Sequence, residues 1–187
     1  MLSTKIAPEQ LNQVLWRWKV AGLIRPVGPR ADVWFNLVRD ADITRERWEQ
    51  AVKRALPSAV RAGHPILMSS GLSTQMSSSD YLIRPARSLS AGIDGATLHE
   101  RPALWMRRLQ RVGAIQTCGV LPQLDPGAAL ADLIRFEPGF DDQIDEIDWD
   151  ELSEESRQML LELVSDADVE LPRQALGGRS RVTPDRA

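Results

Sequence analysis

The sequence predicts an α+β protein, and three observations on its 187 residues carry this prediction. Several stretches repeat apolar residues at the three- and four-residue spacing of an amphipathic helix. Short apolar runs bounded by glycine and proline alternate with these stretches and are typical of strands. The composition, 43% hydrophobic and 26% charged, is that of a soluble globular protein.

The first predicted element is a helix from Pro8 to Ala21, with Gly22 as its left-handed end. Four apolar side chains share one face of it: Leu11, Val14, Leu15 and Trp18. Two short apolar runs follow, at 23–24 and 33–35, and they enclose Gly28-Pro29-Arg30. A helix, a glycine stop and a hairpin with a basic tip are typical of the second half of a winged-helix DNA-binding module. We therefore predict a partial winged-helix module over residues 1 to 40.

The outer face of this helix carries polar side chains suited to DNA, and the hairpin adds two arginines. Amides and guanidinium groups form hydrogen bonds with base edges and phosphates in a major groove. The predicted DNA-binding residues are Gln10, Asn12, Gln13, Arg17, Arg25 and Arg30. Arg25 and Arg30 are expected to flank a tight turn that touches the DNA backbone or the minor groove. Polar residues outside an amphipathic helix are equally typical of any surface helix, so this pattern alone leaves both interpretations open.

A small mixed α/β domain is predicted over residues 41 to 136. Its helices are expected at Thr44–Leu56, Pro102–Val112 and Pro126–Phe136, where the apolar residues keep helical spacing. Its strands are expected at Pro65–Met68, Tyr81–Ile83, Ala96–Leu98 and Ile115–Leu121, with a loop or short helix at Ser69–Ser79. Cys118, within the last of these strands, is predicted to be a small buried apolar residue.

The chain ends in an acidic region, predicted as an acidic linker and helix over residues 137 to 171. Phe140–Asp150 is rich in aspartate and is predicted to be a solvated connector. A helix is predicted from Asp150 to Ser165, where leucine, methionine and valine form one stripe. Glycine, arginine and proline dominate residues 172 to 187, which predicts a loose tail.

The net charge of −3 hides an uneven distribution. Residues 1 to 135 hold 18 Lys and Arg against 11 Asp and Glu, whereas residues 136 to 187 hold 5 against 15. A basic body suits a polyanionic partner, because Lys and Arg displace condensed counterions from phosphates. The acidic end either folds back on the basic body or meets a basic protein. Two solvated faces without a partner are the remaining alternative.

Few residues point to catalysis, and we expect no enzyme activity and no cofactor. His64 and His99 are the two histidines, the first at the entrance of a predicted strand and the second at the end of one, and both are expected to be structural. The serine-rich turn after residue 68 lacks the second glycine of a nucleophile elbow, since Gln75 stands in its place. With Cys118 as the one cysteine, a cysteine metal cluster is excluded, and no metal site is predicted. Without a signal sequence or a long apolar stretch, the expected location is the cytoplasm, without membrane association.

The order of elements resembles the AbiEi-type antitoxins of type IV bacterial toxin–antitoxin pairs. The segments that carry the resemblance are Val20-Ala21-Gly22-Leu23-Ile24-Arg25, Gly71-Leu72-Ser73, His99-Glu100-Arg101-Pro102 and Leu124–Asp132. The likeness extends over about residues 8 to 136. Each of these motifs is short and degenerate.

The resemblance implies a non-catalytic repressor of its own operon that binds double-stranded DNA at its own promoter. A second domain would counteract a nucleotidyltransferase-like toxin from the same operon. The DNA-binding role would fall on Gln10, Asn12, Gln13, Arg17 and Arg30. A full winged helix has two more helices ahead of the DNA-reading helix, and only seven residues precede Pro8. A longer chain or a partner chain, as in a homodimer on an inverted repeat, would complete the module.

A second function class also fits the sequence. In it the chain is a protein-interaction module that docks a basic partner through its acidic carboxy-terminal segment.

Overall fold

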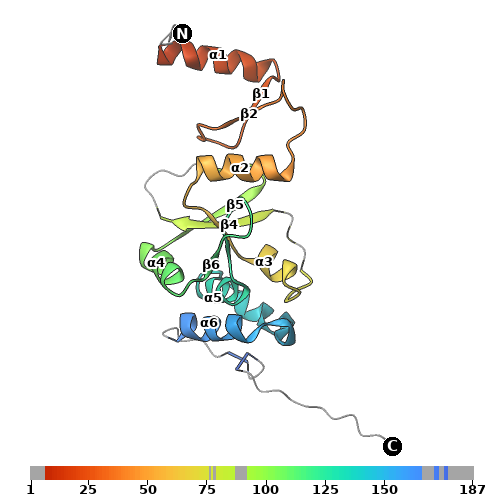
Figure 1. The fold of residues 1–187 in the computed structure, drawn as a ribbon, viewed down its shortest axis with the longest axis vertical. Coiled ribbons are helices and arrows are strands. Elements are labelled where there is room, and N and C mark those ends of the chain that lie inside the picture. The colour runs from red at the N-terminus through yellow and green to blue at the C-terminus, as the bar shows by residue number, and fades with distance from the viewer. Residues whose placement is uncertain are drawn as a thin grey trace, which may run out of the picture. The chain divides into compact units, whose positions relative to one another are not determined.

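The computed structural model describes residues 7–75, 77, 79–86, 92–165, 171–172 and 175–176, with Asp141 described in its backbone only. The chain is α+β, with helices and a mixed sheet (Figure 1). It divides into two compact units. The amino-terminal unit comprises Met1–Ser58 and Arg87–Gly95, and the carboxy-terminal unit comprises Ala59–Ala86 and Ala96–Ala187. This division differs from the predicted boundaries after residues 40 and 136.

The amino-terminal unit consists of two helices and a hairpin. Its elements are α1 (Pro8–Val20), β1 (Ile24–Pro26), β2 (Trp34–Asn36) and α2 (Arg45–Ala55). Proline at the first position of α1 fits because that residue needs no hydrogen-bond donor. Gly22 follows α1 with a φ of +69°, which is the predicted left-handed stop. The Thr44 side chain accepts a hydrogen bond from the Arg47 amide and caps α2.

The hairpin is antiparallel and packs a small apolar cluster. Phe35 of β2 lies opposite Arg25 and is buried, together with Ile24 and Val27. Residues 92–95 return to this hairpin: the Asp94 amide donates to the Val27 carbonyl at 2.9 Å. A Cβ atom on Gly28 would lie 2.2 Å from the carbonyl oxygen of Gly92, so this close approach requires glycine.

The carboxy-terminal unit is built on a five-stranded mixed sheet in the order β5-β4-β3-β7-β6. Its strands are β3 (Val60–Arg61), β4 (Asp80–Pro85), β5 (Ala96–Arg101), β6 (Ile115–Gln116) and β7 (Gln123–Leu124). The edge strand β5 runs parallel to β4 over six residues, from Asp80 opposite Ala96 to Pro85 opposite Arg101. The remaining pairs alternate between antiparallel and parallel. None of the described helices is long and apolar enough to cross a bilayer.

Helices cover the sheet of this unit and enclose its core. They are α3 (His64–Ser69), α4 (Ala103–Arg111), α5 (Pro126–Phe136), η1 (Phe140–Glu146), η2 (Trp149–Glu151) and α6 (Glu154–Val164). Tyr81 and Ile83 of β4 join the same core cluster as the inner residues of α4, α5 and α6. Figure 1 shows α5 and α6 side by side, and they pack closely.

The close packing of α5 and α6 depends on small residues. A Cβ atom on Gly127 would lie 1.8 Å from the Ser156 carbonyl oxygen, so the two backbones approach more closely than any other side chain would allow. Asp125 caps α5 by accepting from the Gly127 amide at 2.8 Å. Its second oxygen accepts from the Ser156 hydroxyl at 2.9 Å, which ties the start of α5 to α6.

Two sequence predictions of strands are wrong. Pro65–Met68 lies within α3, because Gly63 with a φ of +65° ends the preceding strand and Pro65 then occupies the first turn of a helix. The predicted strand Ile115–Leu121 is limited to two residues, since the chain turns away at once. Cys118 therefore lies outside the sheet and is exposed rather than buried.

The predicted acidic connector is also different in the structure. Residues 140–151 form the two 3₁₀ helices η1 and η2, and they contribute Phe140, Ile144, Ile147 and Trp149 to the core. The described carboxylates of this segment, from Asp142 to Glu151, are exposed, whereas these apolar side chains are buried. Most of the predicted loose tail, residues 172–187, lies outside the described residues.

Candidate nucleic-acid interface

Most side chains of helix α1 are exposed. It has thirteen residues, and none of them is buried. Val14 and Leu15 are half-buried, and β1 is the neighbour they approach. A helix that contributes so little to the core of its unit presents nearly all of its side chains to the surroundings.

One side of α1 gathers three of the predicted DNA-binding residues. Gln10, Gln13 and Arg17 recur at intervals of three and four residues, so they point in similar directions from the helix axis. All three side chains are exposed, and within the described residues they make no side-chain hydrogen bond or ion pair. Asn12 is exposed as well, but the helical period places it on a different side of α1. Arginine and two amides thus form a compact polar face from which Asn12 is absent.

The hairpin places the two remaining candidates separately. Arg25 lies within β1 and is exposed, and it lines a cavity of about 240 Å³ with Phe35 and Trp48. Arg30 is exposed in the loop between the strands and has a φ of +59°, which is rare for a residue with a side chain. The predicted tight turn is in fact a longer loop, since residues 27–33 separate β1 from β2. Arg25 and Arg30 therefore do not flank one turn.

Large apolar side chains are exposed near the polar face of α1. Trp16 is 65% exposed and Val20 is 68% exposed, and Leu11 and Trp18 are each close to half exposed. Leu23 and Val38, after the helix and after the hairpin, are exposed too. Groups of exposed apolar residues mark interaction surfaces more often than isolated ones do.

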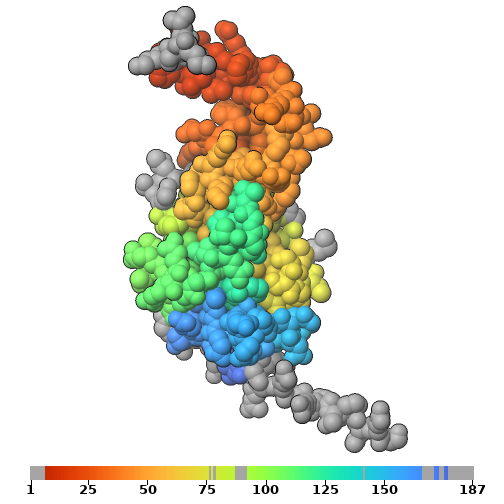
Figure 2. Space-filling view, viewed as in Figure 1, coloured from red at the N-terminus to blue at the C-terminus, as the bar shows by residue number. Residues whose placement is uncertain are grey.

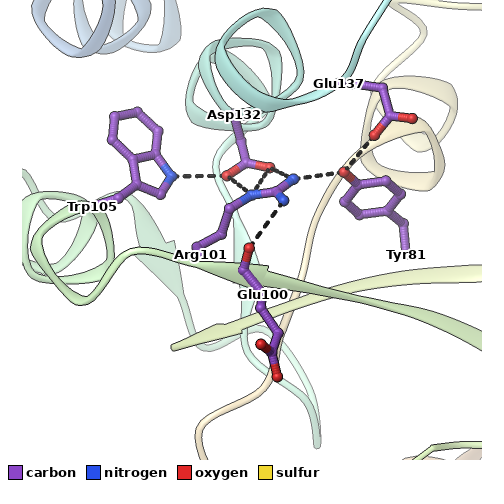
Figure 3. A network of polar contacts seen from close by, with 6 residues as sticks. All are labelled: Tyr81, Glu100, Arg101, Trp105, Asp132 and Glu137. Carbon is purple, nitrogen blue, oxygen red and sulfur yellow. Dashed lines mark hydrogen bonds and ion pairs between the residues drawn. The ribbon is translucent and has the colours of Figure 1, made fainter. Parts of the chain in front are cut away.

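A buried polar network crosses the core of the carboxy-terminal unit (Figure 3). Arg101, at the end of β5, donates to both carboxylate oxygens of Asp132 in α5, with the shortest contact at 2.7 Å. The indole nitrogen of Trp105 in α4 donates to Asp132 at 2.8 Å. Arg101 also donates to the Tyr81 hydroxyl at 2.7 Å, and this hydroxyl donates to Glu137 at 3.1 Å. The network thereby joins β4, β5, α4 and α5.

Burial and charge both act on this network. Burial raises the pKa of the Tyr81 hydroxyl well above its ordinary value, although Arg101 opposes the shift. Burial works to lower the pKa of Arg101, but the hydrogen bonds and the charge of Asp132 outweigh it and raise that pKa. The ring of His99 stacks on Tyr81 at 3.8 Å, and burial lowers the pKa of His99 with a further contribution from Arg101. The donors of Arg101 match the carboxylate oxygens of Asp132, and the pair ties β5 to α5.

The network fixes one side of α4, and the opposite side of α4 is basic. Leu104, Arg107, Arg108 and Arg111 line a groove of about 420 Å³. The helical spacing of these arginines is visible in the sequence. The groove itself is not visible in the sequence, and neither is the hydrogen bond by which Arg108, one of its lining residues, donates to the Glu162 carbonyl of α6 at 2.6 Å.

Comparisons with protein-family models, with curated proteins and with solved structures found no match to this chain. The geometry of the described residues is therefore the basis for assigning a function.

Proposed function

We propose that the chain is a DNA-binding transcriptional regulator, and that α1 reads the major groove of its own promoter. The single observation that carries the proposal is the polar face of α1. Gln10, Gln13 and Arg17 lie together on a helix that buries no residue, and no described partner occupies them. An amide pair beside a guanidinium group matches the donors and acceptors of base edges and phosphates.

The hairpin after α1 supports the same proposal. Arg30 is exposed in the loop between β1 and β2, where a winged helix carries its wing, and Arg25 is exposed on β1. Residues 1 to 58 hold ten Lys and Arg against six Asp and Glu, so this part of the chain is basic. A positive charge brings a DNA-binding surface to a polyanion and makes its affinity dependent on salt.

In this proposal the chain acts like the AbiEi-type antitoxins that its sequence resembles. It represses its own operon in the cytoplasm, counteracts a nucleotidyltransferase-like toxin, and catalyses no reaction. A homodimer would match an inverted repeat in the operator.

Fluorescence anisotropy with the duplex that lies upstream of the chain's own reading frame tests the proposal. The double variant Arg17→Ala with Arg30→Ala is expected to bind about tenfold more weakly or worse, because two contacts to phosphates are lost. Arg54→Ala is the matched control, since Arg54 is an exposed arginine on α2 and not on the proposed interface. Equal binding by the wild type and the double variant would refute the assignment.

A second candidate function is docking of a basic partner on the acidic surface. Exposed carboxylates follow one another from η1 to α6: Asp142, Asp145, Glu146, Asp148, Asp150, Glu151, Glu154, Glu155 and Glu162. Deleting this region would also remove Phe140 and Trp149 from the core, so substitution is the sound test. The triple variant of Asp142, Asp145 and Asp148 to Asn is expected to lose affinity for a lysine-rich peptide. Unchanged affinity would exclude this surface.

A further inference from the structure

The outer side of α4 carries what we call the arginine stripe: Leu104, Arg107, Arg108 and Arg111. These residues recur at the three- and four-residue spacing that aligns side chains along one side of a helix. Leu104 is 72% exposed, and the stripe lines the groove of about 420 Å³ described above. The green atoms of α4 lie at the molecular surface in Figure 2.

Contacts on two sides hold the helix that carries the stripe in place. Trp105, Met106 and Leu109 are buried on the other side of α4, and the bond from Trp105 to Asp132 ties the helix to α5. At the end of α6, Arg108 donates to the Glu162 carbonyl at 2.6 Å and to the Ser165 hydroxyl at 3.4 Å. These contacts satisfy the carboxy-terminal end of α6, where positive charge is favoured.

Arg107 and Arg111 are different from Arg108. Both are exposed, and neither forms a hydrogen bond or an ion pair with any residue that the structure describes. They stand one helical turn apart, with the exposed Leu104 one turn before Arg107. Two guanidinium groups and one leucine side chain therefore face the same groove.

Charge complementarity selects an anionic occupant with an apolar group. Guanidinium groups pair with carboxylates in a two-pronged geometry, and Leu104 provides a contact for an aliphatic side chain. A DNA duplex fits this groove poorly, because it carries one charge for about every 1.7 Å of its length. Such a polyanion would extend past the stripe toward the exposed Glu162, whose carbonyl accepts from Arg108, whereas a short segment stays on the stripe.

We propose that the arginine stripe binds an acidic segment of a partner protein, in which carboxylates flank a leucine-sized side chain. This surface lies in the carboxy-terminal unit and does not depend on DNA binding by α1. An NMR titration of the ¹⁵N-labelled full chain with the acetylated peptide Glu-Glu-Leu-Glu-Glu-Leu tests it. Shifts are expected in the amides of α4 and in the side-chain Nε–H signals of Arg107 and Arg111. The matched neutral peptide, with Gln in place of each Glu, is expected to cause none of these shifts.

Substitution of the stripe arginines tests whether the peptide binds at the arginine stripe. The double variant Arg107→Gln with Arg111→Gln is expected to weaken peptide binding about fivefold or more, because two exposed ion pairs are lost. Both residues are exposed, so the double variant is expected to keep the NMR spectrum of a folded chain. Arg54→Gln on α2 is the control and is expected to keep full affinity for the peptide. Three results would overturn the proposal: no shifts at millimolar peptide, equal affinity of the double variant, or shifts of the Arg107 and Arg111 signals by a DNA duplex but not by the peptide.

Discussion

Helices α1 and α5 both have a proline in the first turn, but they differ in their burial. Of the eleven residues of α5, eight are buried, including the charged Asp132, whereas α1 buries none of its thirteen. Helix α5 packs against α3 and α6 and anchors the polar network, and α1 approaches β1. The two helices therefore differ in how much of their surface contacts the rest of the chain. The side chains of α5 belong to the core of its unit, whereas those of α1 are left outside any core.

The largest effect is expected at Asp132. The variant Asp132→Ala leaves the buried Arg101 guanidinium without its carboxylate and is expected to destabilise the chain by about 3–5 kcal/mol. Urea unfolding monitored by tryptophan fluorescence measures this. The double variant Arg101→Met with Asp132→Leu removes both charges and is expected to recover much of the loss. A stable Asp132→Ala variant would show that α5 is not the anchor that its burial indicates.

The second prediction concerns the contact of α5 with α6. Gly127→Ala places a carbon within 1.8 Å of the Ser156 carbonyl, so the helices must move apart, at a cost of about 1–3 kcal/mol. Gly113→Ala is the control, since it has a φ of +72° and nothing within 4 Å of the added carbon. Thermal unfolding is measured for both variants. Gly127→Ala reports the cost of steric overlap, and Gly113→Ala reports the cost of backbone strain alone. A Gly127→Ala variant as stable as the wild type would contradict the close packing of α5 and α6.

The third prediction is a dependence on pH. Because burial lowers the pKa of His99 in the folded chain, the unfolded chain takes up this proton first as the pH falls. The free energy of unfolding is therefore expected to decrease as the pH falls below about 6.5, and this contribution levels off below the folded pKa. His99→Phe keeps a ring against Tyr81 and removes the titration, so its curve is expected to be flatter in this range. Parallel curves for the two proteins, from urea unfolding at several pH values, would rule out this role of His99.

The smallest effect is expected on α1. Trp16 is 65% exposed, so Trp16→Ser is expected to change the free energy of unfolding by less than about 0.5 kcal/mol. Trp105→Ser, at a tryptophan that is 4% exposed, is the contrasting variant and is expected to cost several times more. If both variants lose similar stability, α1 is part of a core and the contrast with α5 fails.

The sequence predicted much of the secondary structure and little of the packing. Helix α5 begins and ends where the periodicity placed it, because proline and an aspartate cap define its start. Pro65 misled the prediction, since a proline bounds a strand and starts a helix equally well. In residues 140–151 the many carboxylates favoured the interpretation as a solvated connector. The apolar residues between them, among them Phe140, Ile144 and Ile147, join the core instead.

The polar network and the groove needed three-dimensional information. Asp132 is the one carboxylate in a largely apolar helix, which signals a buried partner, but nothing in the sequence points to Arg101, thirty-one residues earlier. The arginines of α4 are visible in the sequence, whereas the groove that they line is not. The polar side chains of α1 were identified from the sequence, and the structure adds that Gln10, Gln13 and Arg17 share one side without Asn12.

The salt dependence of DNA binding by single variants of α1 tests the central proposal most directly. For a duplex from the chain's own upstream region, anisotropy gives the slope of the logarithm of the binding constant against the logarithm of the salt concentration. Arg17→Ala is expected to reduce this slope by about 0.9, the value for one lost phosphate contact. Gln13→Ala is expected to leave the slope unchanged and to lower the preference for this duplex over a scrambled one. The same slope for Arg17→Ala and the wild type, with the same sequence preference for Gln13→Ala, would contradict DNA binding by α1.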